Sequence, residues 1–294
     1  MSAIANSDLT LRVAADGVAP VHARLRGVTR SFKREGDGNI LHALGPVDLD
    51  LMQGEFFSII GPSGCGKSSF LKVLGGLDRP TSGTITFEGK PVDGSVPEGV
   101  GVVFQEDASF PWLNVRDNVA FGLRWSGLPR PEIRARVESA IAFTGLSDFA
   151  KSYPAHLSGG MRQRVCIART MVTRPRLILL DEPFGALDQQ TRLLMGEELL
   201  RLWRETGATV LLITHSLDEA VMLSQRIGVM SARPGHFIDI LETKWPDDRD
   251  SAIVEDPRFG SLTSRLWGFL RHESLKTMKG APTSAAAPKG TPLA

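Results

Sequence analysis

A glycine-rich segment with one lysine and several serines follows directly after the apolar run Phe56–Ile60. It fits the pattern GxxxxGK[ST] between a predicted strand and a predicted helix, which wraps backbone N–H groups around an anionic phosphate chain. Lys67 is expected to hold the β- and γ-phosphates of a nucleotide, and the Ser68 hydroxyl is expected to ligate Mg²⁺. The flanking strand and helix disfavour the alternative of an ordinary glycine-rich turn. The predicted nucleotide-binding residues of this segment are Gly61, Ser63, Gly64, Cys65, Gly66, Lys67, Ser68 and Ser69.

Two adjacent carboxylates, Asp181 and Glu182, end the apolar run Leu177–Leu180. Ligand sites of open α/β sheets lie at the carboxyl ends of the strands. Asp181 is therefore expected to bind Mg²⁺, and Glu182 to take the proton of the water that attacks the γ-phosphate. His215 ends another such run, and this position favours a γ-phosphate contact over a core or solvent-facing histidine. A plain acidic loop is the alternative for the carboxylate pair, and the phosphate-binding pattern disfavours it.

Four unbroken apolar runs of strand length predict the scaffold that positions these groups. They are Phe56–Ile60, Val100–Phe104, Leu177–Leu180 and Val210–Ile213. A strand covered on both faces needs no polar side, so these runs predict a central parallel sheet. The segment Thr84–Glu88 alternates instead and precedes Gly89, which predicts a half-exposed antiparallel strand at the edge of the fold.

Helical periodicity replaces the strand pattern between the second and third of these runs. Pro131 near the first turn and Gly145 past the end predict a helix that ends at Phe143. A second helix is predicted from Ser158 to Thr173. The predicted fold class is α/β, with a P-loop NTPase core around a central mostly parallel sheet. It includes an N-terminal antiparallel β-subdomain and an inserted α-helical subdomain at about residues 106–175.

Composition excludes several classes of protein. The chain has 34 lysine and arginine residues against 33 aspartate and glutamate residues, a formal net charge of +1, which argues against a nucleic-acid partner. Its two cysteines, Cys65 and Cys166, are too few for a secreted disulfide framework and indicate a reducing compartment. Cys65 is expected to be a packed thiol rather than a redox switch. No run approaches the roughly 18 to 20 apolar residues that span a bilayer, so a membrane role requires a partner.

The segment LSGGM at residues 157–161 adds a further signal. Ser158 is predicted to cap the helix that follows, and Gly159 and Gly160 leave backbone N–H groups open to an anion. With the motifs above, residues 22 to about 240 resemble the nucleotide-binding subunit of an ATP-binding cassette (ABC) transporter. LSGGM differs from the family signature LSGGQ only at Met161. The predicted organisation is a disordered tail at 1–20, an ABC ATPase domain at 21–240, a C-terminal extension at 241–278 and a disordered tail at 279–294.

The resemblance implies that two copies of the chain bury two ATP molecules between them, head to tail. The signature residues Ser158, Gly159 and Gly160 of one copy would then contact the ATP held by the other. Gln105 matches the family's Q-loop, whose side chain reaches Mg²⁺ and the attacking water, and Asp188 matches the D-loop. Phe32 matches the aromatic residue that stacks on adenine, with a core phenylalanine as the alternative.

The stretch from Val103 to Leu123 resembles the nitrate, sulfonate and taurine importer branch of the family. That branch implies membrane permease subunits as partners, a solute-binding protein outside the cell as an indirect partner, and a peripheral location on the cytoplasmic face of the inner membrane. The apolar loop Phe110–Val115 has two interpretations that the sequence leaves open, a docking surface for the permease or core packing of the helical insertion.

Two other functions are weighed against an importer subunit. A soluble ABC-type ATPase acting on DNA or the ribosome usually carries long coiled coils or two cassettes, and 294 residues accommodate neither. A P-loop kinase or GTPase would leave the LSGGM segment and His215 without a role. The sequence beyond about Ser231 contains no functional motif that we identify. An amphipathic helix that packs on the core is predicted there from the spacing of Leu262, Leu266, Phe269 and Leu270.

Overall fold

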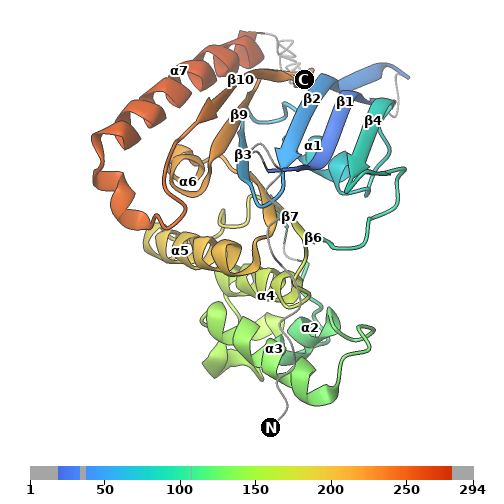
Figure 1. The fold of residues 1–294 in the computed structure, drawn as a ribbon, viewed down its shortest axis with the longest axis vertical. Helices are drawn as coiled ribbons and strands as arrows, with labels where there is room; N and C mark the ends of the chain where they lie inside the picture. Colours follow the sequence, from blue (N-terminus) through green and yellow to red (C-terminus); the bar gives the residue numbers. More distant parts are fainter. Residues whose placement is uncertain (1–18, 34–37, 107, 280–294) are drawn as a thin grey trace, which may run out of the picture.

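A computed structural model describes residues 19–33, 38–106 and 108–279 of the chain. Within these residues the strands form a six-stranded sheet in the order β10-β9-β3-β8-β7-β6 and a four-stranded sheet in the order β2-β1-β4-β5 (Figure 1). The strands of the larger sheet are β3 (Phe56–Ile60), β6 (Val100–Val103), β7 (Leu177–Asp181), β8 (Thr209–Ile213), β9 (Arg226–Met230) and β10 (Phe237–Glu242). The predicted fold class is confirmed.

The larger sheet is parallel except at β10, which pairs antiparallel with β9. Every residue of β3, β7 and β8 is buried. Successive side chains enter different apolar clusters, so that Ile178 packs with the helices on one face and Leu179 with the antiparallel sheet and a helix on the other. This arrangement explains the unbroken apolar runs.

Strand β6 departs from the expectation of full coverage. Val100 and Val102 are only half-buried, and Phe104 lies beyond the strand with 37% of its surface exposed. The reason is position, because β6 is the last strand of its sheet and pairs only with β7. The prediction Val100–Phe104 is therefore one residue longer than the strand, and the strand is only partly buried rather than covered on both faces.

The smaller sheet is antiparallel. It comprises β1 (Val21–Lys33), β2 (Ile40–Met52), β4 (Ser82–Phe87) and β5 (Lys90–Pro91). Its inner side chains, such as Leu25 and Ile85, pack with Phe70 of helix α1 (Lys67–Leu74). The prediction for residues 84–88 is confirmed in its alternation and its antiparallel pairing, although β4 lies between β1 and the short β5 rather than at a free edge.

Three helices form the lower end of the molecule in Figure 1. They are α2 (Val115–Phe121), α3 (Arg130–Phe143) and α4 (Gly159–Met171), with 3-10 turns at Ser147–Phe149 and Pro154–His156. A separate apolar cluster that includes Val119, Ile141 and Val165 joins them. Both helices predicted in this region are confirmed, and all three lie within the predicted insertion.

The remaining helices are α5 (Gln189–Thr206), α6 (Leu217–Leu223) and α7 (Pro257–Lys279), with a 3-10 turn at Ser251–Glu255. Trp203 of α5 and Leu266 of α7 are buried in the cluster on one face of the larger sheet. The predicted amphipathic helix around Leu266 is thus confirmed as a packed element. Among the described residues no helix is long and apolar enough to cross a membrane. The predicted tails fall almost entirely outside the described residues.

A polar network that runs from buried His22 and Thr209 to exposed Glu88 and Arg176 joins the two sheets. His22 of β1 places Nδ1 2.5 Å from the Thr209 hydroxyl of β8 and Nε2 3.3 Å from Glu88. Glu88 also accepts hydrogen bonds from Arg176 at 2.6 and 3.0 Å. Burial lowers the pKa of His22 below its ordinary value of 6.5, and the contact with Glu88 offsets only part of this effect.

We expect the buried His22 to make stability depend on pH. Because its pKa is lower in the folded chain, the unfolded chain binds more protons as the pH falls below about 6.5. The stabilisation present above that pH is lost progressively from there down to the folded pKa. Urea unfolding at pH 7.5 and 5.5 should show a smaller loss in His22→Gln than in the wild-type chain. The control is His42→Gln, which removes an exposed histidine from β2. Equal losses in wild type and His22→Gln would contradict the prediction.

Candidate active site

A cleft of about 400 Å³ opens at the carboxyl ends of β3, β7 and β8. This volume is in the range of ligand sites. The lining residues are Phe32, Leu41, Ala43, Ser63, Gly64, Gly66, Lys67, Ser68, Ser69, Gln105, Glu182, His215 and Arg233. Residues far apart in the sequence thus share one cavity, and most of them were predicted from the sequence.

The loop between β3 and α1 forms the floor of the cleft. Gly66 has φ of 113°, and an added Cβ would lie 2.5 Å from the carbonyl oxygen of Ala43, so only glycine fits. Lys67 is 5% exposed, and its Nζ donates hydrogen bonds to the carbonyls of Gly61 and Pro62 at 2.8 and 3.0 Å. The first N–H groups of α1 have no partner within the helix, as at any helix start. The loop therefore presents positive charge and N–H donors to an anion.

Two predicted members of this loop lie beneath its surface. Gly61 and Cys65 are buried and do not line the cleft. Cys65 is a free cysteine with 1% of its surface exposed, and burial raises the pKa of its thiol. A buried thiol held in its neutral form is a poor nucleophile, which agrees with the expectation of a packed side chain.

Strand register brings the catalytic candidates together. Asp181 of β7 pairs with Ile213 of β8, and the N–H of Glu182 donates to the Ile213 carbonyl at 2.9 Å. His215 follows Ile213 by two residues, and its Nε2 lies 2.6 Å from Glu182 Oε1. Gln105, beyond the end of β6, donates from Nε2 to Glu182 Oε2 at 2.9 Å. The carboxylate of Glu182 is thus held from two sides.

Glu182 also has an unusual backbone conformation. Its φ is 48°, in the left-handed region that side chains other than glycine rarely adopt. Residues held in this region cost on the order of 1–3 kcal/mol each and cluster at functional sites. The turn sets the direction of the Glu182 side chain relative to the strand end.

Asp181 fits a divalent cation. Its side chain is 5% exposed, it shares a hydrogen bond with Ser68, and its Oδ1 has no hydrogen-bond partner among the described residues. Burial raises the pKa of Asp181, and the nearby Glu182 carboxylate adds to the effect. A buried carboxylate with an unused oxygen next to a serine hydroxyl offers the oxygen donors that Mg²⁺ prefers.

The structure does not bring the signature residues or Asp188 into this cleft. Ser158 caps α4 by accepting a hydrogen bond from the Met161 N–H at 3.3 Å, and it is exposed together with Gly159. Gly160 packs against Leu187, because a Cβ there would lie 2.7 Å from Leu187 Cδ2. The signature turn and the segment before α5 are therefore neighbours.

Asp188 acts as the amino cap of α5. Its carboxylate accepts hydrogen bonds from the Thr191 N–H at 3.0 Å and from the Thr191 hydroxyl at 2.7 Å. These bonds from Thr191 lower the pKa of Asp188. A structural role for Asp188 is thus visible within one copy of the chain.

The lining of the cleft decides between the two interpretations of Phe32 and includes three residues that the sequence did not predict. Phe32 lies in the cleft, half-buried, with the Arg30 guanidinium 4.4 Å above its ring, so it is not a core residue. Sequence reasoning missed Leu41, Ala43 and Arg233. No sequence signal identified Leu41 or Ala43, whereas Arg233 lies next to a Pro-Gly pair that signals a turn.

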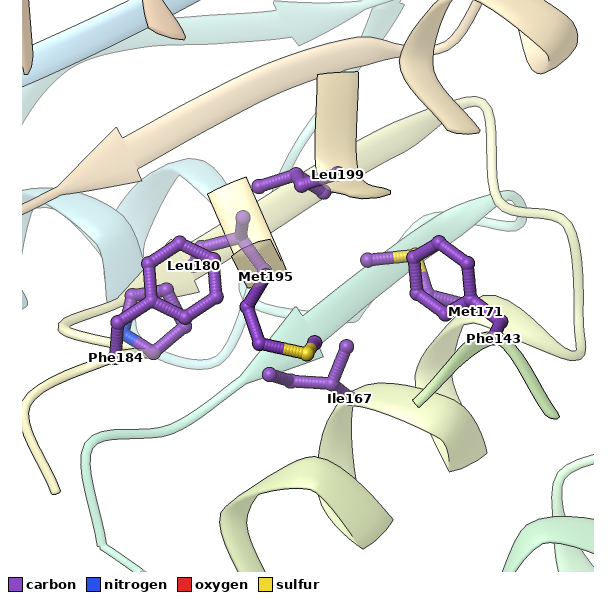
Figure 2. A pocket seen from close by; sticks show the side chains of 8 residues that line it. Phe143, Ile167, Met171, Leu180, Phe184, Met195 and Leu199 are labelled. Atoms are coloured by element: carbon purple, nitrogen blue, oxygen red, sulfur yellow. The ribbon is translucent and has the colours of Figure 1, made fainter. Parts of the chain in front are cut away.

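A second, much smaller cavity lies next to the residues that follow β7, since Pro183 and Phe184 line it. Figure 2 shows Phe184, Met195, Ile167 and Leu199 around it, and its volume is about 10 Å³. The lining comprises Phe143, Ile167, Met171, Leu180, Pro183, Phe184, Met195 and Leu199. Such a space is about one water in size, and apolar walls give a water no partners, so it is a packing gap rather than a ligand site.

Comparisons with known proteins identify the family. The model of the family "ABC transporter" matches residues 44–185. An uncharacterized ABC transporter ATP-binding protein of Methanocaldococcus jannaschii is 41% identical over 259 residues, which cover 88% of this chain and 95% of that protein. The chain belongs to the ABC transporter family.

Other matches indicate the branch of the family to which this ABC cassette is similar. The bicarbonate transport ATP-binding protein CmpC of Synechococcus elongatus is 44% identical over 253 residues, covering 85% of this chain and 38% of CmpC. The nitrate import ATP-binding protein NrtC of Synechocystis is 41% identical over 258 residues, covering 86% of this chain and 38% of NrtC. The predicted resemblance to the nitrate importer branch is confirmed.

A solved structure supports the enzyme class. The ATP-binding cassette MJ0796, solved as a dimer in a post-hydrolysis state with ADP and Pi, superposes with a TM-score of 0.68 and 31% identity. The match covers 76% of this chain and all of that one. The cassette described here is an ATP-binding, ABC-type ATPase.

Proposed function

We propose that this cassette is the ATP-hydrolysing subunit of an importer for a small anion of the nitrate, sulfonate or taurine type. The observation that carries the proposal is the cleft in which Lys67, Gln105, Glu182 and His215 converge. CmpC and NrtC, whose names refer to bicarbonate and nitrate, support a small anion as the solute.

The side chains of the cleft have different roles in ATP hydrolysis. Lys67 and the N–H groups of its loop hold the β- and γ-phosphates, and Phe32 stacks on the adenine. Glu182 accepts a proton from the attacking water while His215 contacts the γ-phosphate. Ser68, Asp181 and Gln105 would hold Mg²⁺, which neutralises charge on the phosphate oxygens.

Two copies of the cassette complete the site. Ser158, Gly159, Gly160 and Asp188 lie outside the cleft of their own copy, and all but the half-buried Gly160 are exposed. In a head-to-tail pair they would meet the triphosphate bound by the partner, as the backbone donors at the start of α4 suit an anion. The dimeric MJ0796 cassette supports this arrangement.

An aromatic row on the helical region supports a membrane partner. Trp112 and Trp125 are 70% and 76% exposed, and the rings of Phe110 and Phe121 connect them at centroid distances of 4.6 to 5.5 Å. Buried Asn118 fixes the loop through hydrogen bonds to Phe110 and to two further carbonyls. Exposed tryptophans on a rigid support are typical interface anchors.

Each of the two interpretations of the loop Phe110–Val115, a docking surface and core packing, therefore holds for some of its residues. Val115 is fully buried in the helical core, whereas Trp112 faces outward. We propose that the aromatic row docks on the permease and that the cassette lies at the cytoplasmic face of the inner membrane. The extracytoplasmic solute-binding protein would act through the permease, and no nucleic acid takes part.

Co-expression with any multi-spanning membrane protein found to be encoded beside this chain tests the proposal. We expect co-purification, and ATP-dependent uptake of nitrate, bicarbonate or taurine into vesicles that contain the assembled complex. Trp112→Ala should reduce co-purification at least tenfold and leave the ATPase activity of the isolated cassette unchanged. Trp267→Ala is the matched control, because Trp267 is 59% exposed on α7. An active ATPase that retains no membrane protein would instead support a soluble ABC-type ATPase.

A further inference from the structure

An arginine that no motif assigns lies in the nucleotide cleft. Arg233 belongs to the loop Ser231–His236 between β9 and β10, which we term the Arg233 loop. Its exposed side chain lines the cleft, and its Nε donates a hydrogen bond to the Gly64 carbonyl at 3.0 Å. Gly64 is part of the phosphate-binding loop, so the guanidinium lies where an anionic phosphate chain is expected.

The Arg233 loop is packed tightly enough to fix this position. The Gly235 N–H donates to the Ala43 carbonyl, and the Gly45 N–H donates to the Gly235 carbonyl, both at 3.0 Å. A Cβ on Gly235 would lie 2.2 Å from the Cys65 carbonyl oxygen, so the backbone presses against the phosphate-binding loop. The Arg233 loop therefore fills the space between β2 and that loop.

The C-terminal helix holds the same loop from the other side. Glu273 of α7 is 3% exposed, and its Oε2 accepts a hydrogen bond from the Ala232 N–H at 2.8 Å. Lys276 Nζ donates to Oε1 of the same carboxylate at 2.6 Å. Burial alone would raise the pKa of Glu273, but the contacts with Lys276, the Ala232 N–H and His272 together prevail and lower it. The carboxylate is thus charged and anchored, and α7 packs beside β9 at this end of the molecule (Figure 1).

We infer that Arg233 binds the phosphate chain of the nucleotide and that Glu273 is a positioning residue that holds the Arg233 loop for this contact. A guanidinium has five N–H donors in a planar fork, and the bond to Gly64 uses one of them. The others suit phosphate oxygens, to which arginine bonds in pairs. The C-terminal extension thereby acquires a role in nucleotide binding. This inference rests on the proposed nucleotide site.

Calorimetric titration of the full chain with ADP and with a non-hydrolysable ATP analogue tests the role of Arg233. Arg233→Gln should weaken binding about tenfold, the effect of losing one charge-assisted contact. Arg233→Lys keeps the charge without the fork and should show a smaller loss. Arg265→Gln is the matched control, because Arg265 is an exposed arginine of α7 that pairs with Asp239 at 3.1 Å.

The outcomes separate this inference from the proposed function. A wild-type chain that binds no nucleotide would overturn both. A wild-type chain that binds, with Arg233→Gln binding equally well, would overturn only the role of Arg233.

Paired substitutions at Glu273 test its positioning role. Glu273→Leu removes the acceptor for the Ala232 N–H and should raise the KM for ATP several-fold with little change in kcat. Glu273→Gln keeps an acceptor oxygen and should remain close to wild type. If Glu273 acts through Arg233, adding Glu273→Leu to Arg233→Gln should weaken binding no further. Additive losses would overturn the positioning role, and so would a Glu273→Leu chain that binds as tightly as wild type. If Glu273→Leu fails to unfold cooperatively, Glu273→Ser takes its place in the same cycle.

Discussion

Replacement of Glu182 with Gln is expected to lower ATP turnover at least 100-fold and to leave ATP binding intact. General bases contribute about 10²- to 10⁴-fold to the rates of enzymes. Glutamine matches glutamate in shape and can still bond to Gln105 and His215, which lie 2.9 and 2.6 Å from the carboxylate. The variant therefore removes the base and little else. Release of phosphate under saturating ATP measures the effect.

The same variant should also accumulate as a closed dimer in the presence of ATP. If the triphosphate bridges the loop of Lys67 in one copy to Ser158 of the other, blocking hydrolysis prolongs that bridge. Light scattering coupled to size-exclusion chromatography, with and without ATP, measures the mass. Glu106→Gln is the matched control, since Glu106 is an exposed carboxylate next to Gln105. Turnover within several-fold of wild type would refute the assignment of Glu182 as the base.

The sequence predicts the residues at the carboxyl edge of the parallel sheet well, because local sequence patterns determine where each strand ends. Buried parallel strands are apolar throughout, so the ends of β3, β7 and β8 can be located by the first polar residue after each run. Parallel strands share one carboxyl edge, and this rule alone places Lys67, Glu182 and His215 near one another. The 2.6 Å contact between His215 and Glu182 follows from the pairing of Asp181 with Ile213.

The antiparallel sheet is less visible in the sequence. Strand β1 pairs with β2 over 13-residue strands, but the register shifts at several points, including between Leu25 and Val28. Each shift breaks the two-residue alternation that reveals a half-buried strand. Leu41 and Ala43 of β2 line the cleft because β2 packs beside the phosphate-binding loop, and no local pattern encodes that proximity.

Contacts between distant segments explain why Arg233 escapes sequence reasoning. Its hydrogen bond to Gly64 spans 169 residues, and Glu273, which supports its loop, lies a further 40 residues along the chain. The signature residues present a different limit. Ser158 is predicted correctly as a helix cap. The nucleotide contact that we propose for it would require a second copy, which the fold of one chain does not contain.

Replacement of Lys67 with Met should weaken nucleotide binding at least 100-fold. The ammonium group is buried at the floor of the cleft, where it is worth more to an anion than in water because less solvent screens it. Methionine has similar length and no charge, so it fills the space without the charge–phosphate contact. Calorimetric titration with ADP and a non-hydrolysable ATP analogue measures the loss. Lys72→Met, at an exposed position on the same helix, should bind as wild type.

The design of the Lys67 experiment must separate lost binding from lost folding. Lys67 donates to the carbonyls of Gly61 and Pro62, and the substitution leaves both acceptors without that donor. We therefore expect a modest fall in the unfolding midpoint together with the large loss of affinity. Thermal unfolding in the absence of nucleotide measures the first effect alone. A Lys67→Met chain that unfolds cooperatively and still binds nucleotide within threefold of wild type would show that Lys67 does not bind the nucleotide. Because Lys67 is the main predicted phosphate ligand of the cleft, that result would also count against the proposed function.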